Sequence, residues 1–408
     1  MSVLSRRAAV ITFAAFAFAY FFSALLRAIT ATLAPTLTAE FSLNARDLGL
    51  LAGGYFFGFS AMQLPLGAWL DRHGPKTVIL GFLAVAAAGC LAFSWANSFS
   101  TLLAARVLCG VGVGACLMAP LTGFRRWLTP AAQLRANSWM LMTGSFGMVA
   151  STLPVQWLMP VTGWRPLFWG LAALIVVSMG VIAWIVPAWE RAPAAEQGGS
   201  RHGSYAEVWR HPYFRRLAPI GFVSYGGMIA VQTLWAGPWM VRVAGYEPLQ
   251  AAAGLFSINL SMLCTFWAWG LVTPWLARRG VSTDRLIAWG LPFSLVTLAF
   301  IVAAGPAAGA AAWALFCVTC TFVALSQPAL ALAFPPALAG RALSAYNLVI
   351  FGGVFVVQWG IGLLIDAFGA LGLAEVDAFR AAMGVFLVAS IGAFGCFLLG
   401  ERHNRGRT

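Results

Sequence analysis

The stretch Gly67-Ala68-Trp69-Leu70-Asp71-Arg72-His73-Gly74-Pro75-Lys76 places four charged or titratable side chains between two long apolar runs. The run before it, 48–70, and the run after it, 77–96, carry no charged residue. Gly74 and Pro75 favour a turn, because proline cannot continue a helix and glycine accepts backbone conformations that other residues avoid. The stretch therefore predicts a charged turn at a membrane surface, between two transmembrane helices.

The composition of the whole chain also indicates a membrane protein. Hydrophobic residues make up 61% of the 408 residues and charged residues only 9%, so a soluble domain of this composition would expose an almost entirely apolar surface. Apolar runs of about 20 residues can cross a hydrocarbon core of ~30 Å as helices. Twelve such runs can be placed, at 9–34, 47–70, 77–96, 100–122, 136–159, 166–186, 215–241, 250–276, 285–304, 309–333, 342–366 and 378–399. We therefore expect an all-α polytopic membrane protein with twelve transmembrane helices.

The order of residues in the charged turn, G-x-x-x-D-R-x-G-x-K, resembles the loop between the second and third spans of the major facilitator superfamily of secondary transporters. The resemblance implies that this loop lies on the cytoplasmic face and helps to latch the closed state. It makes Gly67, Asp71, Arg72, Gly74 and Lys76 the candidate latch residues. It also implies two pseudo-symmetric six-helix bundles with a substrate site between them, near the membrane midplane.

The net charge of +13 comes from basic residues that are concentrated on one side of the predicted membrane. With the amino terminus inside, Arg46, Arg165, Arg242 and Arg380 lie outside, two arginines lie within spans, and the other Lys and Arg residues lie in cytoplasmic segments. The positive-inside rule then places both termini in the cytoplasm. We expect a multi-pass protein of a bacterial-type inner membrane, with the lipid bilayer and not nucleic acid as the partner of its basic residues.

A weak internal repeat divides the chain into two halves. Arg72-His73-Gly74 matches Arg278-Arg279-Gly280 at an offset of 206, and Arg135 matches Arg341 at the same offset. A further match, at an offset of 205, pairs Tyr20 and Arg27 with Tyr225 and Gln232. Repeats at one offset predict two bundles of the same topology.

We place the amino-terminal bundle at 1–189, a cytoplasmic linker at 190–214 and the carboxy-terminal bundle, with a short cytoplasmic tail, at 215–408. Ala277 stands in the second copy of the turn where Asp71 stands in the first. A latch that uses this carboxylate should therefore be stronger in the amino-terminal half.

Span four carries Arg106-x-x-x-Gly110-x-Gly112-x-Gly114, which is similar to the second signature of the same family. The resemblance associates this arginine with coupling in proton-driven members. The glycines do not indicate a nucleotide loop, because no strand precedes them. Within an apolar helix they predict close approach of neighbouring backbones.

Two charged side chains lie inside the predicted spans, Arg27 and Arg106. A charge at the centre of a membrane helix costs about 2.5 kcal/mol or more, so each needs a reason. At ~1.5 Å per residue both lie about 10 Å below the outer surface. The fork of donors on an arginine suits a carboxylate or phosphate, so the pair predicts a clamp for an anionic substrate. The alternative for Arg106 is hydrogen bonding to backbone carbonyls alone.

The second half offers polar and aromatic groups in place of charge. Gln232, Trp235 and Trp239 occur at spacings of three and four in span seven, which predicts one helix face. The candidate substrate contacts in this half are Tyr225, Gln232, Trp235, Trp239, Asn259, Gln327, Tyr346, Asn347 and Gln358. The alternatives are interhelical hydrogen bonds for the amides and packing or an interfacial belt for the tryptophans.

Acidic groups are absent from the span interiors, since Asp71 and Asp366 lie at span ends. A proton-driven pump usually keeps such a group at membrane depth. We therefore expect anion exchange, facilitated movement, or proton coupling through the substrate or through these two acids. Cys317 and Cys320 share a helix face and could bind Cu(I), but no clear Met or His ladder accompanies them.

These patterns predict a monomeric secondary transporter that moves a small organic anion, a carboxylate or a phosphorylated metabolite, without a cofactor or a resident metal. Efflux of amphipathic drugs is the first alternative, because the second half is rich in aromatic residues. Copper import and a membrane-embedded enzyme are weaker alternatives. The enzyme is poorly supported, because the spans hold no His and no interior carboxylate that could serve as a base. A transporter-like sensor would need a large soluble domain.

Overall fold

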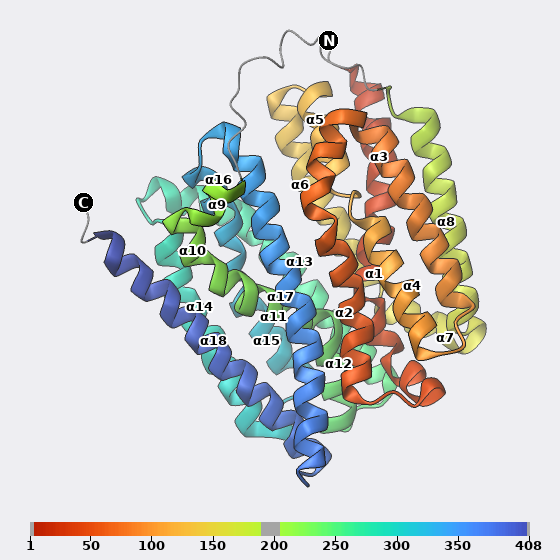
Figure 1. The fold of residues 1–408 in the computed structure, drawn as a ribbon, viewed down its shortest axis with the longest axis vertical. Helices are drawn as coiled ribbons and strands as arrows, with labels where there is room; N and C mark the ends of the chain where they lie inside the picture. Colours follow the sequence, from red (N-terminus) through yellow and green to blue (C-terminus); the bar gives the residue numbers. More distant parts are fainter. Residues whose placement is uncertain (1–3, 189–204, 406–408) are drawn as a thin grey trace. The chain divides into compact units, whose positions relative to one another are not determined.

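The computed structural model describes residues 4–188 and 205–405, and all regular secondary structure in this part of the chain is helical (Figure 1). The chain forms two compact units. Unit 1 consists of Met1–Leu33 and Gly54–Gly199, and unit 2 consists of Ala34–Gly53 and Ser200–Thr408. Two helices, α1 (Arg6–Phe41) and α2 (Ala45–Ala61), contribute to both units.

Unit 1 continues through six more helices, in which α3 packs along both α4 and α8 (Figure 1). They are α3 (Gln63–Ser94), α4 (Phe99–Val113), α5 (Met118–Trp127), α6 (Pro130–Ala150), α7 (Leu153–Thr162) and α8 (Trp164–Ile185). A Cβ on Gly110 would collide with the carbonyl oxygen of Tyr55, and one on Gly112 with the backbone nitrogen of Ala86. The structure thus confirms that the glycines of span four let α2 and α3 approach α4 closely.

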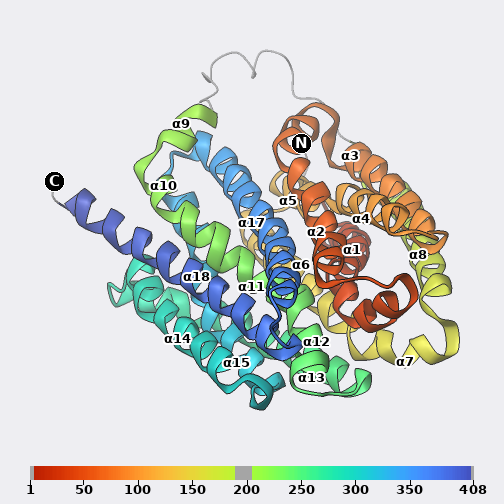
Figure 2. The same ribbon diagram turned by 60° about the horizontal axis from the view of Figure 1, so that its bottom comes forward.

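Unit 2 holds the remaining helices, in which α10, α11, α17 and α18 lie side by side (Figures 1 and 2). They are α9 (Tyr205–Arg210), α10 (Pro212–Pro219), α11 (Gly226–Ala230), α12 (Ala236–Pro238), α13 (Pro248–Arg278), α14 (Thr283–Ala304), α15 (Ala310–Cys320), α16 (Ser326–Ala333), α17 (Pro336–Ala370) and α18 (Glu375–Arg405). The first part of the predicted linker, 190–204, lies outside the described residues, and α9 and the start of α10 form its second part.

In the described part of the chain, ten helices are long and apolar enough to cross a membrane. The predicted spans 47–70 and 136–159 are not among them, and each is divided between two helices. The first runs through α2 and the start of α3, and the second through α6 and α7. The all-α polytopic fold is therefore confirmed, with these two spans interrupted.

The charged turn has the predicted conformation. Gly74 has φ 76° and ψ 164°, which interrupts α3, and Gly280 in the second copy also has φ 76°. Other residues rarely adopt positive φ without strain. The two halves therefore each have a glycine with the same positive φ at corresponding positions, which agrees with the repeat.

Span seven, Pro212–Val243, departs from a regular α-helix. Its stretches Ile220–Tyr225, Val231–Trp235 and Trp239–Val243 are π-helical. Pro219 and Pro238 directly precede two of them, and a proline lacks the N–H that a regular α-helix would use. The wider turns change which side chains share a face, and π-helical turns are frequent at functional sites.

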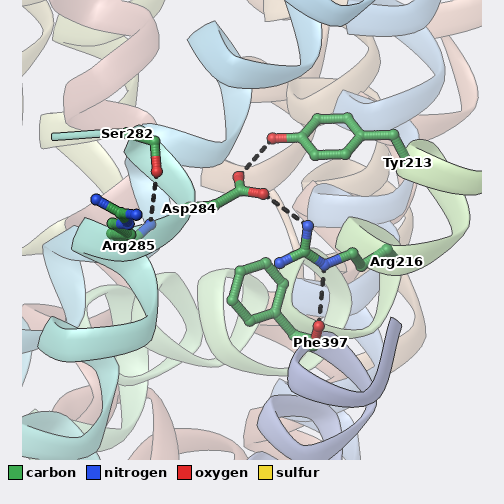
Figure 3. A network of polar contacts seen from close by, with 6 residues as sticks. All are labelled: Tyr213, Arg216, Ser282, Asp284, Arg285 and Phe397. Atoms are coloured by element: carbon green, nitrogen blue, oxygen red, sulfur yellow. Dashed lines mark hydrogen bonds and ion pairs between the residues drawn. The ribbon is translucent and has the colours of Figure 1, made fainter. Parts of the chain in front are cut away.

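A buried ion pair connects three helices of unit 2 (Figure 3). Arg216 on α10 is 6% exposed and donates from Nη1 to Oδ2 of Asp284 on α14 at 2.6 Å. The Tyr213 hydroxyl donates to the other carboxylate oxygen at 2.7 Å, and Arg216 Nε donates to the carbonyl of Phe397 on α18 at 3.0 Å. The network thus fixes the starts of spans seven and nine against the last span.

We expect Asp284→Asn to lower the stability of the protein by about 1–3 kcal/mol, because the buried Arg216 charge would lose its partner. The measurement is the apparent midpoint of thermal unfolding in detergent. Asp377→Asn is the matched control, because its ion pair with Arg380 is 55% and 36% exposed and such pairs contribute about 0–1 kcal/mol. Equal midpoints for the two variants would contradict this role of Asp284.

The turn geometry gives a second prediction. Gly280→Ala should lower the same midpoint, because alanine at positive φ costs about 1 kcal/mol although no atom lies within 4 Å of the added Cβ. Gly270→Ala in α13 is the control, since its Cβ also meets nothing and its backbone is helical. The control should raise the midpoint. A midpoint for Gly280→Ala at or above that of Gly270→Ala would contradict the positive φ of Gly280.

Candidate functional site

The candidate site of unit 1 is built around Arg27, between α1 and α2. Tyr20 and Arg27 lie two turns apart on α1, and Tyr55 and Phe59 lie one turn apart on α2. The Arg27 guanidinium interacts with the hydroxyls of Tyr20 and Tyr55. Its Cζ also lies 5.6 Å from the centre of the Phe59 ring. Arg27 is partly exposed, so a cationic group with phenol and phenyl neighbours is accessible in this unit.

Arg106 on α4 lies on the other side of Tyr55. Its Cζ is 5.0 Å from the centre of the Tyr55 ring, and its side chain is 0% exposed. Nη1 donates to the carbonyl of Leu26, the residue before Arg27, at 3.0 Å. Nε and Nη2 have no hydrogen-bond partner among the described residues. Arg106 therefore makes the hydrogen bond to a backbone carbonyl that the sequence analysis gave as its alternative role. It also lies directly beside the segment that carries Arg27.

Tyr55 links the two arginines to α1. Its hydroxyl donates to the carbonyl of Ser23 at 3.1 Å, and its ring is fully buried. The structure thus brings Arg27 and Arg106 together around one aromatic ring, as their matched depth suggested. The two differ in accessibility, because Arg106 is enclosed and Arg27 is not.

The described part of unit 1 contains a single acidic residue, Asp71, which is exposed in the charged turn. The two arginines therefore give the interior of this unit a net positive charge. Charge in a low-dielectric interior acts over a longer distance than it does in water. A solute that enters beside Arg27 would meet a positive electrostatic potential.

In unit 2, one polar cluster remains partly exposed. Gln327 Nε2 donates to Oδ1 of Asn347 at 2.7 Å, and the Tyr225 hydroxyl lies 3.5 Å from Oε1 of Gln327. Asn347 is buried, whereas Tyr225 and Gln327 are partly exposed. Three of the predicted contacts, from spans seven, ten and eleven, therefore lie together.

The remaining amides of unit 2 bond to other helices. Gln232 Nε2 donates to Oδ1 of Asn259 at 2.9 Å, which joins span seven to α13. Gln358 Nε2 donates to the Thr233 hydroxyl at 2.9 Å. All three amide residues are buried. They therefore join helices within unit 2. Interhelical hydrogen bonds are the alternative that the sequence analysis gave for these amides.

The aromatic candidates of unit 2 donate to internal acceptors as well. Trp235 Nε1 donates to the carbonyl of Gln358 at 3.0 Å, and Trp239 Nε1 to the carbonyl of Ala308 at 2.9 Å. The Tyr346 hydroxyl lies 2.9 Å from that of Ser326. Gln232, Trp235 and Trp239 do not form the single face expected from their spacing, because span seven is π-helical here and each contacts a different element.

The candidate latch residues occupy the turn of unit 1. Asp71 and Arg72 are exposed and Lys76 is partly exposed, while Gly74 supplies the turn. A Cβ on Gly67 would meet nothing within 4 Å. No ion pair of Asp71 occurs within the described residues, so the latch stays a prediction.

Cys317 and Cys320 are both buried, and Cys320 Sγ lies 3.6 Å from the carbonyl of Ser224. Among the described residues no group of three or more His, Cys, Asp and Glu side chains could hold a metal ion. Metal binding by the two thiols stays a prediction that no third ligand supports.

Sequence reasoning missed Tyr20, Tyr55 and Phe59 as members of the site. Tyr20 entered only as part of the repeat. The signal for the other two was their spacing of four in span two, at a depth close to that of Arg27. An arginine inside a membrane needs aromatic or carbonyl neighbours. The aromatic residues of span two at the same depth could therefore have been identified as neighbours of Arg27.

Curated relatives of this chain are membrane transporters. It is 26% identical over 254 residues to a probable sulfoacetate transporter of Cupriavidus necator, covering 57% of this chain and 57% of that protein. The inner membrane transport protein YajR of Escherichia coli is 27% identical over 62% of this chain and 54% of its own length. A 4-hydroxybenzoate transporter of Acinetobacter baylyi is 24% identical, with 59% and 60% covered. The chain thus spans somewhat more than half of the length of these relatives.

Solved structures show the same fold over nearly the whole chain. A bacterial homologue of the human lysosomal transporter Spinster matches 98% of this chain and 98% of its own, with a TM-score of 0.79 and 17% identity. The family model of the Major Facilitator Superfamily matches residues 16–357. This chain therefore belongs to the Major Facilitator Superfamily of membrane transporters.

Proposed function

We propose that this protein is a secondary transporter that moves a small organic anion by alternating access, with Arg27 as the direct contact of the anionic group. Membership of the family and the transport activity named for its relatives support the general function. The observation that supports an anionic substrate is the cluster of Arg27, Tyr20, Tyr55 and Phe59, with Arg106 on the other side of Tyr55.

The chemistry of the cluster suits an oxyanion. The planar fork of an arginine can donate two parallel hydrogen bonds to a carboxylate, sulfonate or phosphate. The Tyr20 hydroxyl can donate to the same group, and the Phe59 ring offers apolar contact for the carbon skeleton. The Tyr55 hydroxyl already donates to the Ser23 carbonyl, so it acts on the anion through its interaction with Arg27. Arg106 contributes charge without occupying space that the solute needs, because it is enclosed between α1, α2 and α4.

The named substrates of two relatives agree with this assignment. Sulfoacetate carries a sulfonate and a carboxylate, and 4-hydroxybenzoate is an aromatic carboxylate. A third relative is described as an anion transporter. This chain matches 57% and 60% of the length of the first two proteins and 26% of the third, so their substrates identify a chemical class for testing.

In unit 2 we propose Tyr225, Gln327 and Asn347 as solute contacts. This cluster is the partly exposed one among the predicted contacts, and amides and phenols orient a ligand without adding charge. Gln232, Trp235, Trp239, Asn259, Tyr346 and Gln358 support the cluster as interhelical contacts.

We further propose that the protein works as a monomer in a bacterial-type inner membrane, with both termini in the cytoplasm. The distribution of Lys and Arg supports this orientation. Transport would be coupled to a second anion or to a proton that travels with the substrate. No cofactor or resident metal is required for either.

Arg27→Ala should lower the initial rate of anion transport into proteoliposomes by about tenfold or more, because a lost charge-assisted bidentate contact corresponds to roughly 1.5–3 kcal/mol. Arg27→Lys should recover only part of the rate, since lysine keeps the charge without the fork. The matched control is Arg165→Ala in the same unit, whose side chain donates to Ala96 and stacks on Trp164. A rate for Arg27→Ala equal to that of Arg165→Ala would remove Arg27 from the site.

Labelled sulfoacetate and 4-hydroxybenzoate should each exchange against unlabelled compound in these proteoliposomes, whereas a purine ribonucleoside and a cationic dye should not. The positive charge of the site favours anions and repels cations. Movement of the dye or nucleoside with no movement of either anion would favour the efflux alternative over the proposed function.

Tyr55→Phe tests the phenol separately from the ring that packs on Arg106. The KM for the anion should rise by about two- to tenfold, as expected for one hydrogen-bonding group. The phenylalanine ring keeps the packing but loses the hydrogen bond to the Ser23 carbonyl, so the unfolding midpoint should fall only by the amount that corresponds to about 1 kcal/mol. A large fall in the midpoint with an unchanged KM would make Tyr55 a structural residue.

A further inference from the structure

Ala34–Gly53, the end of α1 and the start of α2, packs in unit 2 although the repeat assigns it to the amino-terminal half. A Cβ on Gly49 would lie 2.5 Å from the carbonyl oxygen of Gln358, and one on Gly53 would lie 3.0 Å from the Phe355 ring. From the other side, a Cβ on Gly362 would collide with the carbonyl oxygen of Ala45. The start of α2 and the end of α17 are therefore in direct backbone contact.

Asp366 closes this contact at its end. Its Oδ1 accepts from the backbone nitrogen of Ala45 at 3.1 Å, and its Oδ2 accepts from that of Arg46 at 2.9 Å. Asn44 already accepts from the nitrogen of Asp47 at 2.8 Å. The first three N–H groups of α2 are thus satisfied, one by its own chain segment and two by a carboxylate from α17. A carboxylate is favoured there by the helix dipole as well.

The surroundings of Asp366 allow its two hydrogen bonds to α2 to break and form again. Its side chain is partly exposed, and a cavity of about 1040 Å³ lies beside it, lined by Thr38, Leu48, Trp235, Arg242, Asp366 and Glu375 among others. Water from this cavity can satisfy both the carboxylate and the N–H groups after separation. The charged neighbours keep their own partners, because Arg46 pairs with Asp47 at 3.5 Å and Arg242 with Glu375 at 3.7 Å.

We propose that Asp366 is a positioning residue of the transport cycle, which holds the start of α2 against α17 in one state and releases it in the other. α2 belongs to unit 2 up to Gly53 and to unit 1 from Gly54 onward. The repeat, however, assigns Ala34–Gly53 to the amino-terminal half and α17 to the carboxy-terminal half, so alternating access between the repeat halves would part this segment from α17. The positive-inside rule assigns this end of the helices to the outer face. The proposal rests on the alternating access proposed above and is independent of the charge of the solute.

The test measures the separation directly, by pulsed electron resonance between spin labels and without substrate. Labels are attached to Ala39→Cys on α1 and Leu373→Cys after α17, two positions that line the cavity. The exposed thiols are removed by Cys264→Ala and Cys396→Ala. Asp366→Asn should raise the ratio of long to short distances about two- to fivefold, and Asp366→Glu should restore it.

Asp377→Asn is the matched control, because this acid lies at the start of α18 and pairs with Arg380 rather than with α2. Its distances should equal those of the parent. Unchanged distances in Asp366→Asn would overturn the proposal, and so would an equal shift in Asp377→Asn. Failure of the anion assignment would appear instead as normal transport by Arg27→Ala, so the two failures are distinguishable.

Discussion

Inside a bilayer there is no water to complete a hydrogen bond, so each polar group of this chain must find its partner within the protein. Arg106 meets this constraint in part, through the carbonyl of Leu26 and the ring of Tyr55, while its Nε and Nη2 have no hydrogen-bond partner among the described residues. Trp235 and Trp239 meet it through backbone carbonyls, and Gln232 through Asn259. These large polar side chains are therefore used to hold helices together, and many Ser and Thr hydroxyls bond to the backbone of their own helix. Few polar groups remain for a solute.

The site is defined by the groups that this constraint leaves accessible. Arg27 is partly exposed in unit 1, and Tyr225 and Gln327 are partly exposed in unit 2. Arg27 can bind an anionic group, and Tyr225 and Gln327 can hydrogen-bond to a neutral polar group. The enclosed Arg106 adds to the potential at Arg27 and fixes the segment of α1 that carries it.

The sequence was most informative where chemistry and backbone agree locally. The sequence of the charged turn predicted a turn at Gly74 and at the matching Gly280, and both residues have φ 76°. The matched depth of Arg27 and Arg106 predicted that the two side chains lie close together. It could not predict the π-helical stretches of span seven, because a shift in backbone hydrogen bonding leaves the order of apolar residues unchanged. The pairing of Arg216 with Asp284, and of Asp366 with α2, depends on contacts between residues that are distant along the chain, which no local pattern records.

The membership of α1 and α2 in both units has a consequence for how the protein is made. A chain cut in the predicted linker would give an amino-terminal fragment that carries Ala34–Gly53, although the packing partners of this segment lie in the other fragment. Each fragment would then expose the glycine-containing surface, around Gly49 in one and Gly362 in the other, where the two backbones come into contact. Because Ala34–Gly53 packs on α17, we expect complementation of the two fragments to require that both are synthesised into the same membrane.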